Sequence, residues 1–168
     1  MRKLFRDLLI KEMETNKDIF FITADLGYKL WDEIREKFPD RFVNTGASEF
    51  SAVGMAVGLA KMGKIPLIYS ITPFLMYRAF EMIKTYINGE EIPVILLGGG
   101  RDKDYHIDGP SHDASDVKKM FTDFDERANE DTIFSNIKDY WPDTLEDIPT
   151  IFKKVIRDRK PAFISLKK

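Results

Sequence analysis

One helix expected from this sequence carries almost no side chains on two of its faces. Residues 41–63, RFVNTGASEFSAVGMAVGLAKMG, predict a short strand, a tight loop and a helix that begins at Glu49. Small residues recur every four positions on two adjacent stripes of that helix: Ala52, Ala56 and Ala60 on one, Gly54 and Gly58 on the other. A helical glycine costs about 1 kcal/mol relative to alanine, so we expect another element to pack closely against this helix.

The first turn of the same helix holds an acidic residue. Ser48 is a suitable N-cap, which places Glu49 at the helix start. A carboxylate there interacts favourably with the helix dipole, so one explanation is a buried helix with a dipole-matched glutamate. The other explanation is that the acid lies at the entrance of a site enclosed by this helix and the element that packs against it.

Strands alternate with helices along the chain. Apolar, β-rich runs predict strands at residues 18–23, 65–71, 93–97 and 161–166, and a further strand is expected near residues 132–135. Helical periodicity predicts helices at residues 2–15, around residues 31–38 and at residues 145–157. A helix beginning at Pro73 is expected to turn five side chains inward: Phe74, Tyr77, Met82, Ile83 and Tyr86. The alternation predicts an α/β fold, a three-layer sandwich with a mostly parallel sheet and helices on both faces.

Composition excludes several classes of function. The 168 residues contain no repeat or linker, which predicts a single domain over residues 1–168. With a net charge of −2, the chain has no overall positive charge to attract a polyanion, so no nucleic acid partner is expected. The chain has no cysteine for a disulfide or a zinc-thiolate site. It also has neither an apolar run of membrane-spanning length nor a signal peptide, so we expect a cytoplasmic protein without a membrane partner.

Residues able to carry chemistry follow the predicted strands. Asp25 lies where open α/β sheets place ligands, and it is either a turn-former or a neighbour of a cofactor. The glycines at residues 98–100 lack the lysine of a phosphate-binding P-loop and are expected to start a flexible loop over the site. Residues 105–113, YHIDGPSHD, contain both histidines. They form either an Asp-Gly-Pro turn with a capping histidine or a site where His112 exchanges protons near neutral pH.

Three of these segments, in this order, resemble the signature of the pyrimidine-binding domain of transketolase-like thiamine diphosphate enzymes. That signature is a Gly-(small)-x-Glu loop that leads into an Ala/Gly-rich helix, then an aromatic-rich segment, then an Asp-Gly-Pro-(Ser/Thr)-His loop. The corresponding parts here are residues 46–63, 70–84 and 108–112. The fold that the resemblance implies is the thiamine diphosphate-binding fold.

The resemblance implies roles for the cofactor-binding residues. Glu49 would be catalytic, sharing a proton with a ring nitrogen of the cofactor's aminopyrimidine, and burial favours the protonated form of such an acid. Phe74, with Tyr77 beside it, would cover the face of that ring. The register is open by one residue, because the segment fits when anchored either on Phe74 or on Arg78. Asp25 and Ile71 would lie next to the cofactor.

The resemblance also implies substrate contacts. Asp108 and His112 would hydrogen-bond substrate hydroxyls next to the reacting carbonyl, and His112 would be catalytic as well. Arg78 would either reach a substrate phosphate or form a surface ion pair. The family often has a histidine in the loop where this chain has Gly100.

Half of the expected cofactor site is missing from the sequence. In this family Mg²⁺ holds the diphosphate through a Gly-Asp-Gly motif, which this chain does not contain. No metal ligand is therefore assigned here. The resemblance implies a partner chain that binds the diphosphate and Mg²⁺, in an α₂β₂ heterotetramer. The small-residue face of residues 49–62 is expected to lie at such an interface.

The function implied is that of a split transketolase-like transferase, active only with its partner. It would transfer or condense ketol units on small sugar-like substrates, phosphorylated or not. Two alternatives stay open. One is the pyrimidine-binding subunit of a thiamine diphosphate-dependent 2-oxoacid decarboxylase or dehydrogenase. The other is a non-catalytic homologue that only assembles with another protein.

Overall fold

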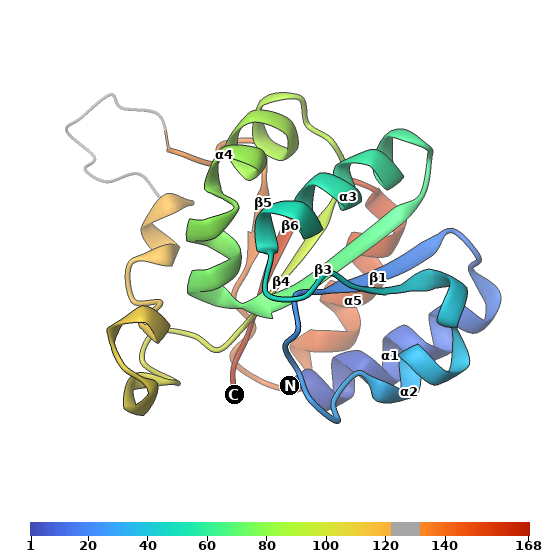
Figure 1. Cartoon of the computed structure of the whole chain (residues 1–168), viewed down its shortest axis with the longest axis horizontal. Coiled ribbons are helices and arrows are strands. Elements are labelled where there is room, and N and C mark those ends of the chain that lie inside the picture. The colour runs from blue at the N-terminus through green and yellow to red at the C-terminus, as the bar shows by residue number, and fades with distance from the viewer. Residues whose placement is uncertain (122–131) are drawn as a thin grey trace.

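The computed structural model describes residues 1–121 and 132–168, which form a parallel sheet with helices on both faces (Figure 1). The strand order is β2-β1-β3-β4-β6-β5, and every pair is parallel. The strands are β1 Ile19–Thr23, β2 Phe42–Asn44, β3 Ile65–Ile71, β4 Ile95–Gly99, β5 Lys138–Tyr140 and β6 Ala162–Leu166. The predicted three-layer α/β architecture is confirmed.

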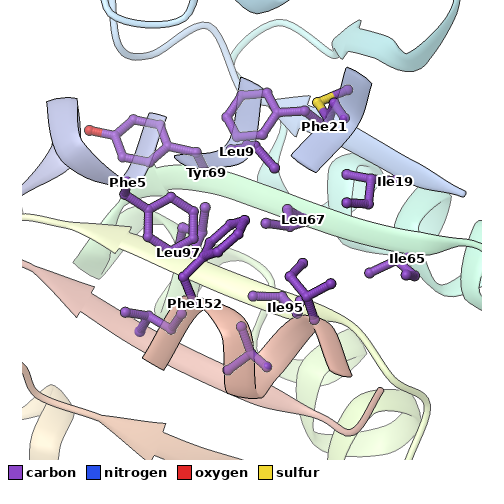
Figure 2. Packing of buried hydrophobic residues seen from close by; sticks show 14 of the residues in the cluster. Phe5, Leu9, Ile19, Phe21, Ile65, Leu67, Tyr69, Ile95, Leu97 and Phe152 are labelled. Carbon is purple, nitrogen blue, oxygen red and sulfur yellow. The ribbon is translucent and has the colours of Figure 1, made fainter. Parts of the chain in front are cut away.

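One face of the sheet is covered by α1 Arg2–Thr15, α2 Asp32–Lys37 and α5 Asp147–Asp158. Figure 2 shows how Phe5 of α1 and Phe152 of α5 meet over the side chains of the central strands. Their ring centroids lie 5.3 Å apart at an interplanar angle of 82°. Through this edge-to-face contact, α1 and α5 pack against each other on this face of the sheet.

The opposite face is covered by α3 Glu49–Lys61 and by a helical segment that runs through Phe74–Arg78, α4 Phe80–Met82 and Ile83–Gly89. The alanine stripe of α3 points inward, with Ala52 and Ala56 fully buried against the sheet. The glycine stripe is divided: a Cβ atom built on Gly54 would lie 3.4 Å from Cε of Met82, whereas one built on Gly58 meets nothing within 4 Å. The close packing predicted for this helix therefore involves its alanines and Gly54 within this chain, and Gly58 stays open.

The helical segment of residues 74–89 turns part of the predicted face toward the core. Of the five residues predicted to point inward, Ile83 is fully buried, Met82 and Tyr86 are half-buried against the same core, and Tyr77 is 39% exposed. The buried positions recur about every four residues: Leu75, Met76, Ala79, Ile83 and Ile87. Residues 74–78 and 83–89 are π-helical, with the wider turns of i→i+5 hydrogen bonds. The α-helical period therefore placed Met82, Ile83 and Tyr86 correctly and failed at Tyr77.

The strand expected near residues 132–135 is also wrong, because this stretch forms turns and β5 begins at Lys138. Phe134 is buried against the rings of Phe80 and Phe121, with centroids 5.7 and 5.3 Å away. Its amide donates to the carbonyl of Met120 and not to a strand. The apolar character of this stretch thus reflects the burial of one ring.

The glycine run at the end of β4 is buried, and the expectation that it starts a flexible loop is wrong. Gly98 and Gly99 belong to β4 and are buried. A Cβ atom on Gly98 would collide with the side chains of Thr72 and Phe163. The Thr72 hydroxyl donates to the carbonyl of Gly100 at 2.5 Å. These glycines leave room for the side chains of Tyr69, Thr72 and Phe163, which lie against β4.

Four short 3₁₀ turns complete the described secondary structure: Pro39–Arg41, His106–Asp108, Pro110–His112 and Val117–Met120. Across the described ranges, no helix combines the length and the apolar character that crossing a bilayer requires.

The strand order has a switch point beside β1. The chain leaves β1 for β2 on one side and then crosses to β3 on the other. At such a switch point, the loops at the carboxyl ends of the two neighbouring strands run in opposite directions and leave room for a ligand. The loop after β1, the start of α3 and the end of β3 all lie at this edge.

Candidate functional site

Glu49 begins α3 at this edge, as predicted. The preceding loop turns at Gly46, whose φ of 69° favours glycine, and Ser48 is the N-cap residue. The Ser48 hydroxyl donates to Oγ of Ser51 at 2.8 Å and caps no amide. The Glu49 side chain is only 1% exposed. A first-turn acid that only matched the helix dipole would not need such burial.

The buried carboxyl group has two partners. Ser70 Oγ of β3 donates to Glu49 Oε1 at 2.9 Å. Arg78 Nη1 donates to Oε2 at 3.1 Å and to Oε1 at 3.3 Å. A buried carboxyl group is costly unless its oxygens accept hydrogen bonds, and both oxygens of Glu49 do so. The sequence prediction missed Ser70. The signal for it is a hydroxyl group near the end of the otherwise apolar run IPLIYSI.

The ring of Phe74 contacts residues of the predicted motif segments. The Arg78 guanidinium carbon lies 3.8 Å from the centroid of the Phe74 ring. On the same ring, His112 packs edge-to-face with a centroid distance of 4.8 Å and an interplanar angle of 62°. Through Arg78, the cluster continues to Glu49. All three motif segments therefore contribute to one group of contacts.

The register of this aromatic segment is explained by its local geometry. Residues Phe74–Arg78 form a π-helical turn. Such a turn is an α-helix that has taken up an additional residue, and π turns recur at functional sites. The segment therefore fits when anchored either on Phe74 at the start of the turn or on Arg78 at its end.

Tyr77 makes a contact outside the Glu49 cluster. Its hydroxyl donates a short hydrogen bond to the carboxylate of Asp116. Burial, followed by this hydrogen bond, raises the pKa of Tyr77 well above its ordinary value. Tyr77 thus ties the helical segment to the residues that follow the Asp-Gly-Pro-Ser-His loop, and its contact with a cofactor stays a prediction.

The loop that carries His112 consists of two 3₁₀ turns joined at Gly109, whose φ is 95°. The His112 ring is half-buried, and its Nδ1 lies 3.1 Å from Oγ of Ser111. Asp108 is exposed on the same loop, and so is His106. The structure thus brings His112 to the cluster, whereas substrate contacts of Asp108 stay a prediction.

Asp25 has the geometry of a turn residue, with a φ of 56°. Its amide donates to Oδ1 of Asn44 at 2.9 Å, and Asn44 Nδ2 returns a bond of 3.2 Å to its carboxylate. The Gly46 amide also donates to Asn44 Oδ1, at 3.0 Å. Asn44, which the sequence prediction missed, therefore links the loops after β1 and β2. Ile71 ends β3 half-buried, and cofactor contacts of Asp25 and Ile71 stay predictions.

Comparison with known proteins identifies this arrangement. The family model described as "Transketolase, pyrimidine binding domain" matches residues 1–168. The chain belongs to this family. The pyrimidine-binding domain is similar to the putative transketolase C-terminal section of Methanocaldococcus jannaschii, at 32% identity over 67% of this chain and 36% of that protein. It is also similar to one of the subunits of an apulose-4-phosphate transketolase of Actinobacillus succinogenes, at 31% identity over 78% of this chain and 39% of that protein.

A solved structure agrees with the fold of the domain. A split-gene transketolase, described as an inactive beta4 tetramer, superposes with a TM-score of 0.79 at 25% identity, over 99% of this chain and 50% of that one. The domain thus spans less than half of the two curated relatives and half of this structure. Among residues 1–121 and 132–168, no three His, Asp or Glu side chains group as a metal site, so Mg²⁺ binding by a partner chain stays a prediction.

Proposed function

We propose that this domain forms the aminopyrimidine half of a transketolase-like thiamine diphosphate site. The observation that carries the proposal is the burial of Glu49 at the switch point of the sheet, between Ser70 and the Arg78–Phe74 pair. A carboxyl group and an aromatic face are the two contacts that the family uses for the aminopyrimidine ring. The described residues fit that ring, and the sequence contains no Gly-Asp-Gly motif for the diphosphate.

In this proposal each residue has a limited task. Thiamine diphosphate, when bound, supplies the nucleophilic carbon that attacks a carbonyl. Glu49 holds a proton at its carboxyl and shares it with a ring nitrogen. The Ser70 hydroxyl fixes one carboxyl oxygen in place, which leaves the other for that proton. Phe74 provides an apolar face and excludes water beside the acid.

We further propose that the substrates are sugar-like. His112 lies against Phe74, and the Asp108 side chain is exposed on the same loop. An imidazole and a carboxylate suit hydroxyl groups, which a ketose presents and a simple 2-oxoacid does not. The names of the relatives, which include transketolase subunits, support this choice over the decarboxylase alternative.

The other half of the site is assigned to a partner subunit that holds the diphosphate and Mg²⁺, with two copies of each chain in the assembly. Relatives named as subunits of a transketolase support such a division. The outward face of α3 is the proposed contact surface, because Gly58 leaves it open and the apolar Phe50, Met55 and Met62 are exposed. Another helix can approach such a face closely, which would account for the glycine at position 58.

The test combines this chain with a subunit that carries the Gly-Asp-Gly motif. The mixture is expected to bind thiamine diphosphate and Mg²⁺ when neither chain binds them alone, and to convert a ketose phosphate in preference to a 2-oxoacid. Glu49→Gln should lower kcat about 10²- to 10⁴-fold while the circular dichroism spectrum is retained.

Two results contradict the proposal. Tight cofactor binding by this chain in isolation excludes a divided site. A stable complex that takes up no cofactor supports the non-catalytic assembly role.

A further inference from the structure

The guanidinium group of Arg78 lies between the buried acid and the aromatic ring. One nitrogen, Nη1, contacts both oxygens of Glu49, at 3.1 and 3.3 Å. The guanidinium carbon lies 3.8 Å from the centroid of the Phe74 ring. A planar cation thus donates N–H groups to the carboxyl while it packs on the phenyl ring.

These contacts are the two that the proposed function assigns to the aminopyrimidine ring. A guanidinium and an aminopyrimidine are both flat, and both carry N–H groups at the edge. We infer that Arg78 occupies the aminopyrimidine position in the free chain and has to leave before the cofactor binds. This inference rests on the proposed function, since it concerns the same position.

The burial of the three residues is suited to such a displacement. The Arg78 side chain is 48% exposed, whereas that of Glu49 is 1% exposed, so the guanidinium closes the site from the solvent side. It can turn outward without any rearrangement of the core. Ser70 remains bonded to Glu49 after that movement. The neighbouring Tyr77 is held by Asp116, which keeps the backbone in place.

The test uses Arg78→Ala, with Arg35→Ala as the matched control. Arg35 is an exposed arginine of α2 that pairs with Asp32. In the free chain, Glu49 is labelled with a carbodiimide and an amine, and the labelled peptide is quantified by mass spectrometry. Arg78→Ala is expected to increase the labelling of Glu49, and Arg35→Ala to leave it unchanged. Arg78→Gln, which retains a donor, provides a second variant if the alanine variant does not fold.

Calorimetry on the assembled complex provides the second measurement, with thiamine diphosphate and Mg²⁺ as the probe. Loss of a competing hydrogen bond between charged groups is expected to tighten cofactor binding about ten-fold or more. The inference is overturned, with the proposed function intact, if the wild-type complex binds the cofactor but Arg78→Ala binds no tighter, or if Glu49 labelling does not rise. If no variant binds the cofactor, the proposed function fails and the inference with it.

Discussion

The hydroxyl of Ser70 donates a hydrogen bond of 2.9 Å to Oε1 of Glu49, and so connects β3 to the first turn of α3. Ser70 is fully buried and Glu49 is 1% exposed, so water does not replace this donor. The bond fixes the orientation of the carboxyl group. It also shows that the acid is built into the centre of the fold and is not added at the surface.

Replacing Ser70 with alanine should therefore lower stability. The substitution leaves a buried carboxyl oxygen with one donor fewer, and a lost partner of this kind costs about 1–3 kcal/mol. Urea unfolding of the free chain measures the loss. Ser51→Ala, at an exposed position of α3, should change the free energy of unfolding by less than about 0.5 kcal/mol. Equal losses in the two variants would mean that the Ser70 bond contributes nothing.

Gly58→Ala should have opposite effects on the free chain and on its assembly. A Cβ atom at Gly58 meets nothing within 4 Å, so the free chain should gain about 1 kcal/mol from the better helix former. If a partner helix crosses this face closely, the added methyl group should weaken the complex, as measured by analytical ultracentrifugation.

Lys153→Ala on α5 is the control for that experiment. Lys153 is exposed, and α5 covers the opposite face of the sheet, so this variant should assemble like the wild type. An undiminished affinity of Gly58→Ala for the partner would place the interface elsewhere.

Tyr77→Phe should reduce the loss of stability at alkaline pH. Burial, and then the hydrogen bond to Asp116, raise the pKa of Tyr77 above its ordinary value of 10.0. The folded chain thus retains this proton more tightly than the unfolded chain. The corresponding stability is fully present below pH 10 and is lost as the pH rises further.

The measurement is urea unfolding between about pH 8 and about pH 11, where Tyr77→Phe should show a shallower decline than the wild type. Tyr28→Phe is the control, because Tyr28 is 87% exposed. Part of the decline should persist in Tyr77→Phe, since burial also raises the pKa of Tyr69. Identical slopes in all three proteins would contradict the assigned cause.

The start of α3 was predictable because several local signals coincide there. Ser48 precedes Glu49, an apolar strand precedes the loop, and small residues at helical spacing follow. The strands β1, β3, β4 and β6 were equally clear, since buried parallel strands are short apolar runs. The acid and its position at the sheet edge therefore follow from sequence patterns alone.

The contacts of the acid were less predictable because they depend on side chains far apart in sequence. Arg78 was expected to meet a phosphate or a surface partner, and it pairs with a buried carboxyl group 29 positions away. Asn44 and Ser70 supply hydrogen bonds to residues at least 19 positions away in sequence or in the next loop, so a hydroxyl or amide at a strand end marks the donor or acceptor but not its partner. The short strand β5 contains Lys138 and Asp139, whose charges do not give the pattern of a buried strand.

The wide turn at Phe74–Arg78 has a consequence for how this family can diverge. Because a helix absorbs one surplus residue by loosening a single turn, descendants can gain or lose an amino acid here without rotating what comes before or after. Phe74, at the start of this turn, and the helix that leads away from it can thus shift by one residue relative to each other. We expect such a change in length to alter which side chain lies beside Arg78.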